Sequence, residues 1–174
     1  MAPAFEIHAT ATGPLFTDPN IAARFDAEVS AALQELGALG QRLVVEGTPA
    51  GIASGGGGLR GSIFSELRGA PARREEVVSS SVFYAPIVEV GRRPGKQPPG
   101  GPIQLWVTRK LQTPPAEVAS VAFLVARKIG LRGTTGAHMF ERALVKLEPV
   151  VQRRFQELGD RIVARLNAES GGAA

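Results

Sequence analysis

Side chains that could carry chemistry are few in this chain of 174 residues. Cysteine is absent, which excludes disulfides, thiolate catalysis and cysteine metal ligands. The two histidines, His8 and His138, lie far apart in the sequence and have no regularly spaced ligands around them, so a zinc site is not expected. No paired carboxylates lie at helical spacing on a predicted cleft, and neither histidine has the sequence context of a general base. We therefore predict no catalytic residue, no metal site and no cofactor.

A glycine-rich stretch, residues 47–61, invites comparison with a phosphate-binding loop because it contains the run Gly55 to Gly58. Such a loop needs a lysine followed by serine or threonine after its last glycine, to contact phosphate and magnesium. Leu59, Arg60 and Gly61 stand there instead. We interpret residues 47–61 as a mobile linker and not as a nucleotide site.

The formal net charge of +4 is distributed unevenly along the chain. Residues 1–47 hold six acids against two arginines, whereas residues 92–132 hold eight cations against the single acid Glu117. The basic segment of one copy could face the acidic segment of the next in a head-to-tail ring, or it could contact nucleic acid. Solvated cations without a partner are a third interpretation. Aromatic residues, at 6%, do not interleave with the cations, which argues against single-strand binding.

The basic segment begins with eleven residues, 92–102, that cannot form regular structure because they contain four prolines and three glycines. Each proline lacks an amide hydrogen and restricts the residue before it, so the segment is expected to be a stiff arm projecting from a sheet. A stiff basic arm suits docking onto another surface. The candidate interface residues are Arg92, Arg93, Lys96, Gln97, Arg60 and Arg132.

Hydrophobic periodicity predicts a strand and a long helix in residues 1–46. Apolar and polar residues alternate over residues 5–11, as in a strand with one buried face. The N-cap residue Asp18, followed by a proline, begins an amphipathic helix that runs to about residue 45. Gly37 and Gly40 weaken its last turns, so it is expected to end or bend early.

Residues 62–91 predict sheet strands at 62–68, 75–82 and 83–90. Helices are expected over residues 103–168: a short one, for which a strand is the alternative, one at about 117–129, and a last one that Pro149 should kink or break. Residues 169–174 should fray.

These elements make one α+β domain over residues 1–174, with a small, mostly antiparallel sheet packed against a long N-terminal helix and C-terminal helices. The aromatic residues expected to pack within it are Tyr84, Trp106, Phe123 and Phe140.

The order of several packing motifs resembles that of a known family. Residues 84–91 read Tyr-Ala-x-x-Val-Glu-x-Gly and are followed by the proline-rich loop, a tryptophan helix and the segment VAFLVARKIGLRGTTG at 121–136. Together with the entry Leu59-Arg60-Gly61-Ser62-Ile63, this set resembles the tail-completion (head-tail joining, neck) proteins of long-tailed bacteriophages and prophages, over residues 59–166. None of these motifs is a reactive signature.

The resemblance implies an α+β structural virion protein, made in the host cytoplasm and located in the phage neck. Its copies would form a ring, commonly of six, that joins the head-closure or adaptor protein to the tail tube or terminator protein, with DNA passing through the lumen. No apolar run in the sequence reaches membrane-spanning length, so no membrane partner is expected. A tail terminator, a basic nucleic-acid-binding module and a small hydrolase with an unrecognised site are the alternatives.

Overall fold

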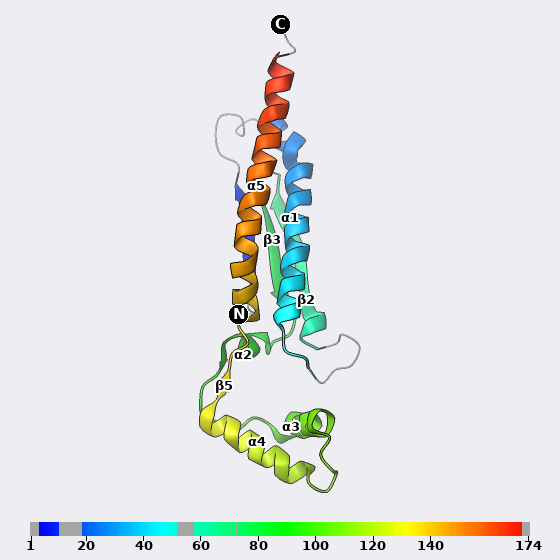
Figure 1. Ribbon diagram of the computed structural model, residues 1–174, viewed down its shortest axis with the longest axis vertical. Coiled ribbons are helices and arrows are strands. Elements are labelled where there is room, and N and C mark those ends of the chain that lie inside the picture. Colours follow the sequence, from blue (N-terminus) through cyan, green and yellow to red (C-terminus); the bar gives the residue numbers. More distant parts are fainter. Residues whose placement is uncertain (1–3, 11–18, 52–57, 72, 172–174) are drawn as a thin grey trace. The chain divides into compact units, whose positions relative to one another are not determined.

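The computed structural model describes residues 4–10, 19–51, 58–71 and 73–171, which divide into two compact units (Figure 1). One, which we call the sheet unit, draws on residues 4–47, 63–80 and 139–174. The other, which we call the helical unit, draws on residues 1–3, 48–62 and 81–138. The chain therefore leaves the sheet unit and returns to it twice. Strands and helices combine into the α+β fold expected from the sequence.

Three antiparallel strands form the sheet of the sheet unit, in the order β1-β3-β2. They are β1 (Phe5–Thr10), β2 (Ile63–Ala70) and β3 (Arg73–Ser80). The strands predicted near these positions are confirmed, with ends shifted by one or two residues. The register places Phe5 opposite Val78 and His8 opposite Glu75.

Two long helices, α1 (Pro19–Gly47) and α5 (Met139–Gly171), pack side by side and cover one face of this sheet (Figure 1). The predicted N-terminal helix is thus confirmed. The sheet contributes Phe5, Ile63 and Val78 to the buried layer beneath the helices. Along the rest of their length the helices bury a second cluster against each other, made of Phe25, Ala32, Leu158 and Ile162.

Helix α5 continues through Pro149, so the predicted break does not occur. Proline removes one intrahelical hydrogen bond. The helix buries Leu147 completely on one side of that position and Leu158 almost completely on the other. Packing on both sides therefore holds the helix together.

Two glycines lie on the buried side of α1. A Cβ atom at Gly37 would lie 2.3 Å from Oε1 of Glu76, and one at Gly40 would lie 2.9 Å from Cζ of Phe5. The expectation that these glycines end the helix early is wrong, because α1 continues to Gly47. Their lack of a side chain instead lets the helix lie close to β3 and β1.

The helical unit consists of short elements. Helix α2 (Ala85–Val90) leads into the strand β4 (Gly91–Arg92), which pairs with β5 (Thr134–Thr135) in antiparallel fashion. Helix α3 (Gly100–Trp106) continues as a π-helical turn, Val107–Leu111, and is followed by α4 (Val118–Arg132). The 3-10 turn η2 covers Arg60–Ser62. The helical interpretation of residues 103–107 and the helix predicted at 117–129 are confirmed.

The strand predicted over residues 83–90 is wrong, because α2 lies there. Pro86 lies in the first turn of this helix, where its fixed φ fits and no amide hydrogen is needed. In a strand the same proline would leave a gap in the hydrogen-bond ladder. Gly91 then ends the helix at φ +79°, a left-handed conformation that side chains rarely adopt.

The basic arm at residues 92–102 begins in β4 of the two-stranded sheet and does not project from it. It lies back on α4, since the Gly95 amide donates a hydrogen bond to the Gly130 carbonyl at 2.7 Å. Its last three residues are helical, because α3 begins at Gly100. The Gln97 side chain lies against Gly130, and the Arg92 guanidinium donates to the Lys96 carbonyl. In the predicted glycine-rich linker, residues 52–57 lie outside the described residues.

Candidate interaction surface

Helix α4 buries its small residues and exposes its large ones. Ala122, Ala126 and Gly130 recur every four residues and are buried. Phe123, Leu124 and Leu131 are 58%, 59% and 68% exposed. Packing normally puts the largest apolar side chains inside a domain, where burying each one is worth about 1.5–3 kcal/mol. Helix α4 leaves that stabilisation unused within the chain.

The exposed apolar residues of α4 share one broad face. Successive residues of an α-helix are about 100° apart, so Phe123, Leu124 and Leu131 lie within about 100° of one another, and the three small residues occupy the neighbouring arc. Arg127 and Lys128 lie on the same side and are exposed. We call these five residues the α4 stripe.

Further large apolar side chains are exposed elsewhere in the helical unit. Around α2, Phe83 is 91% and Val90 is 71% exposed, and the α3 segment adds Leu105, Trp106 and Leu111. Isolated exposed apolar residues are ordinary, but contiguous groups of them mark interaction sites in soluble proteins. The helical unit therefore has the composition of a binding surface.

The residues expected to pack have different surroundings. Phe140 is buried and meets Phe5 edge to face, with ring centroids 6.4 Å apart. Tyr84 is half-buried and makes a similar contact with Phe83 at 5.6 Å. The packing role predicted for Phe123 and Trp106 is wrong within this chain, because both side chains are exposed, Trp106 by 39%. Periodicity alone could not show this, since apolar residues occur on several sides of α4.

Two of the predicted interface residues have local structural contacts. The guanidinium of Arg60 donates to the Thr48 carbonyl from Nε at 2.8 Å and from Nη2 at 2.6 Å. Arg92 is half-buried and holds the arm through the Lys96 carbonyl. The remaining predicted interface residues are exposed or half-buried on the surface of the helical unit: Arg93, Lys96, Gln97 and Arg132.

Most acids of residues 1–47 have partners inside the sheet unit. Asp26 accepts two hydrogen bonds from Arg74, at 2.8 and 2.9 Å, and this guanidinium holds the pKa of Asp26 below its usual value. Glu28 pairs with Arg165 and Glu35 with Arg154, while the other described acids pair as Glu6–His8 and Glu46–Arg42. Asp18 lies outside the described residues. A head-to-tail contact driven by these acids would have to compete with the existing pairs.

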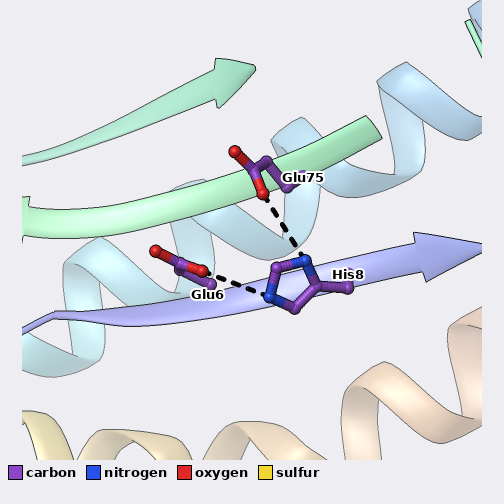
Figure 2. A group of neighbouring side chains, drawn as sticks. All are labelled: Glu6, His8 and Glu75. Atoms are coloured by element: carbon purple, nitrogen blue, oxygen red, sulfur yellow. Dashed lines mark ion pairs between the residues drawn. The ribbon is translucent and has the colours of Figure 1, made fainter. Parts of the chain in front are cut away.

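A group of polar side chains lies on the face of the sheet that α1 and α5 leave open. Figure 2 shows the carboxylates of Glu6 and Glu75 pointing toward the imidazole of His8 from two neighbouring strands. Nε2 of His8 lies 3.2 Å from Glu6 Oε2, and Nδ1 lies 3.5 Å from Glu75 Oε2. Sequence spacing does not predict this cluster, because Glu75 lies opposite His8 only through the pairing of β3 with β1. The available signal was Glu6 two residues before His8 on a strand.

Comparison with known proteins adds no assignment: no family model, curated protein or solved structure matches the chain. Within the described ranges, no helix is both long enough and apolar enough to cross a membrane. Function must therefore be argued from the two surfaces described above. The α4 stripe presents exposed apolar and cationic groups.

Proposed function

We propose that this protein is a structural assembly subunit of the tail-completion class, whose copies associate into a ring at the head-tail joint of a long-tailed phage and let DNA pass. The observation that carries the proposal is the arrangement of α4, with alanine and glycine buried and phenylalanine and leucine exposed. A subunit that completes its core only in an assembly would expose such a stripe when alone. The resemblance of residues 59–166 to the tail-completion family is the reason that we propose the head-tail joint as the assembly.

A second copy of the chain is the occupant that we propose for the α4 stripe. In a ring, every subunit needs a surface that its neighbour covers, and a homo-oligomer supplies that neighbour at equal concentration. The stripe combines apolar groups with Arg127 and Lys128 and has no acid among its five members. Large apolar groups and arginine are enriched at such interfaces.

The proposal is tested by sedimentation equilibrium of the full chain over a wide concentration range, together with a triple variant, Phe123→Ser, Leu124→Ser and Leu131→Ser. We expect the parent chain to self-associate with rising concentration and the triple variant to remain monomeric. A matched control, Val145→Ser with Val163→Ser, changes exposed apolar residues of α5 and should associate like the parent. A parent chain that is monomeric at every concentration would refute the ring.

The virion location needs a separate measurement. Particles induced from the producing host can be labelled with an antibody against this chain and viewed by electron microscopy. Label at the joint between head and tail is the expected result. Label on the head surface or the tail tip, or none on intact particles, would exclude a tail-completion role.

Nucleic-acid binding is the second candidate, and one observation favours it. Residues 92–132 hold eight cations against the single acid Glu117, and most of these cations are exposed. The two candidate functions are separated by measuring how tightly a short DNA duplex binds. The parent chain is compared with the double variant Arg127→Ser, Lys128→Ser. A ring subunit should bind weakly and lose this binding in moderate salt, whereas tight binding by a monomer would favour the nucleic-acid module.

A further inference from the structure

The cluster of Glu6, His8 and Glu75 is set up by the register of the sheet. His8 lies directly opposite Glu75 in the antiparallel pair of β1 and β3. Glu6 is two residues before His8 on the same strand, so its side chain points to the same face. One ligand atom from each of the three residues lies within 4.8 Å of the others (Figure 2). All three side chains are accessible to solvent, by 36% or more.

We propose that this cluster binds a divalent transition-metal ion such as Zn²⁺, with His8 Nε2 and the Glu6 carboxylate as ligands. An imidazole nitrogen with carboxylate oxygen is a donor set that suits such ions. Glu75 accepts the proton of His8 Nδ1 and thereby holds the ring with Nε2 directed at the metal. Water completes the coordination on the open side.

The spacing of the two ligand atoms is close to what this role requires. Zinc binds imidazole nitrogen and carboxylate oxygen at roughly 2.0–2.2 Å, which in a tetrahedral site separates two ligand atoms by roughly 3.3–3.5 Å. The distance between His8 Nε2 and Glu6 Oε2 is 3.2 Å. An ion can therefore lie between them after small side-chain rotations.

Glu75 lies where a metal-binding histidine usually has a hydrogen-bond acceptor for its second ring nitrogen. Such a histidine donates its second ring N–H to a carboxylate or carbonyl, which fixes the tautomer and orients the ring. Glu75 Oε2 lies 3.5 Å from Nδ1, and a slight turn of the ring brings it into hydrogen-bond range. In the tautomer whose proton is on Nδ1, the lone pair of Nε2 is available to the metal.

The charges around the cluster favour a cation. Arg68 on β2 is the cross-strand neighbour of Glu75, but its guanidinium is held by Glu66, at 2.9 Å from Nε and 2.6 Å from Nη2. Arg73, two residues before Glu75 on β3, is another cation on this face of the sheet. The three carboxylates of Glu6, Glu66 and Glu75 exceed these two cations.

The competing account is that His8 simply bridges two carboxylates as a cross-strand ion pair. The two accounts predict different results when metal is added. A structural ion pair binds no ion. A metal site takes up one Zn²⁺ per chain and stabilises the folded chain, because the ion binds the folded chain in preference to the unfolded one.

The test is calorimetric titration of the full chain with ZnCl₂, using protein stripped by a chelator and carrying no histidine tag. We expect saturable binding of one ion and a higher melting temperature with Zn²⁺. His8→Ala and Glu6→Gln should each abolish both effects while leaving the circular dichroism spectrum unchanged. The control His138→Asn removes the other histidine and keeps a residue that tolerates its positive φ, so it should bind like the parent.

Two further variants test the assigned roles. Glu75→Gln keeps an acceptor oxygen for Nδ1 and should weaken binding by no more than about 10–100-fold, as found for partners that orient a ligand. Arg68→Gln removes the nearest cation and should tighten binding. The proposal is overturned if the parent binds no Zn²⁺, if His8→Ala binds as well as the parent, or if Arg68→Gln weakens binding. Abolition of binding by Glu75→Gln would overturn the orienting role of Glu75.

Discussion

Gly37 of α1 lies directly against the carboxyl group of Glu76 in β3. A Cβ atom at Gly37 would lie 2.3 Å from Oε1 and 2.6 Å from Cδ of that side chain, which is only 2% exposed. The glycine therefore makes room for a buried acid between helix and sheet. Ser65 is hydrogen-bonded to the acid, but Oε2 of Glu76 has no hydrogen-bond partner among the described residues. Burial accordingly raises the pKa of Glu76.

Substitution of Gly37 by alanine should destabilise the chain although alanine is the better helix former. The new methyl group must displace the buried Glu76 side chain, and such overpacking costs roughly 1–3 kcal/mol. The matched control is Gly159→Ala in α5, where nothing lies within 4 Å of the added carbon. It should stabilise the chain by about 0.5–1 kcal/mol. Urea unfolding measures both, and a stabilised Gly37→Ala variant would refute the close contact.

The raised pKa of Glu76 predicts a loss of stability as the pH rises. The folded chain holds this proton more tightly than the unfolded chain, so its contribution declines between the ordinary pKa of 4.5 and the raised folded value. Glu76→Gln removes this dependence. As the pH rises through that window, we expect the unfolding free energy of the parent chain to fall relative to that of Glu76→Gln. Below and above the window, the difference between the two unfolding free energies should be constant. A difference that does not change with pH would contradict the assignment.

The Asp26–Arg74 pair predicts the opposite pH dependence. Because Arg74 lowers the pKa of Asp26, the stabilisation is present above the ordinary value of 3.8 and is lost as the pH falls through the lowered folded pKa. Asp26→Asn should cost about 1–3 kcal/mol at neutral pH and little in acid, since the pair is largely buried. The exposed pair Arg68–Glu66 is the comparison, and Glu66→Gln should cost much less than Asp26→Asn, because solvent screens an exposed pair. Equal costs for the two variants would count against this account.

The exposure of Trp106 predicts a modest effect of its truncation. Loss of a fully buried tryptophan costs roughly 3–5 kcal/mol, but this side chain is 39% exposed, so Trp106→Ala should cost about 1–2 kcal/mol. Its neighbour Val107 is completely buried. Val107→Ala removes far fewer atoms and should nevertheless cost about 2 kcal/mol, through lost burial and the cavity left behind. Thermal melting of the two variants checks the order, and a Trp106→Ala variant that unfolds would place the ring in the core.

The elements that could be predicted from the sequence are those whose apolar residues recur with the period of a helix or strand that has one buried side. Helix α1 and strand β1 carry regular apolar spacing, and each lies within a few residues of its expected position. Strand preference failed at α2, because the apolar run at residues 82–90 is rich in valine and the position of Pro86 decides between strand and helix. Continuity of α5 through Pro149 depends on tertiary packing, which a local rule does not contain.

The candidate surfaces were harder to predict. Apolar residues surround most of α4, so spacing alone could not show that the alanines would face inward and Phe123 outward. In the histidine cluster, Glu6 and His8 are visible as alternate residues of a strand. Glu75 joins them only through the register of β1 with β3, and the local sequence does not specify that register.

The interrupted course of the chain through the sheet unit has a consequence during protein synthesis. Helix α5 packs against α1 and covers Phe5, yet residues 81–138 of the helical unit separate it from β3. A ribosome adds about 5–20 residues per second, so the completed three-stranded sheet and α1 wait several seconds for α5 to emerge. During that interval Phe5, Phe25 and Ala32 lack their final cover. The nascent chain is thus an expected client of the chaperones that bind apolar segments at the ribosome exit.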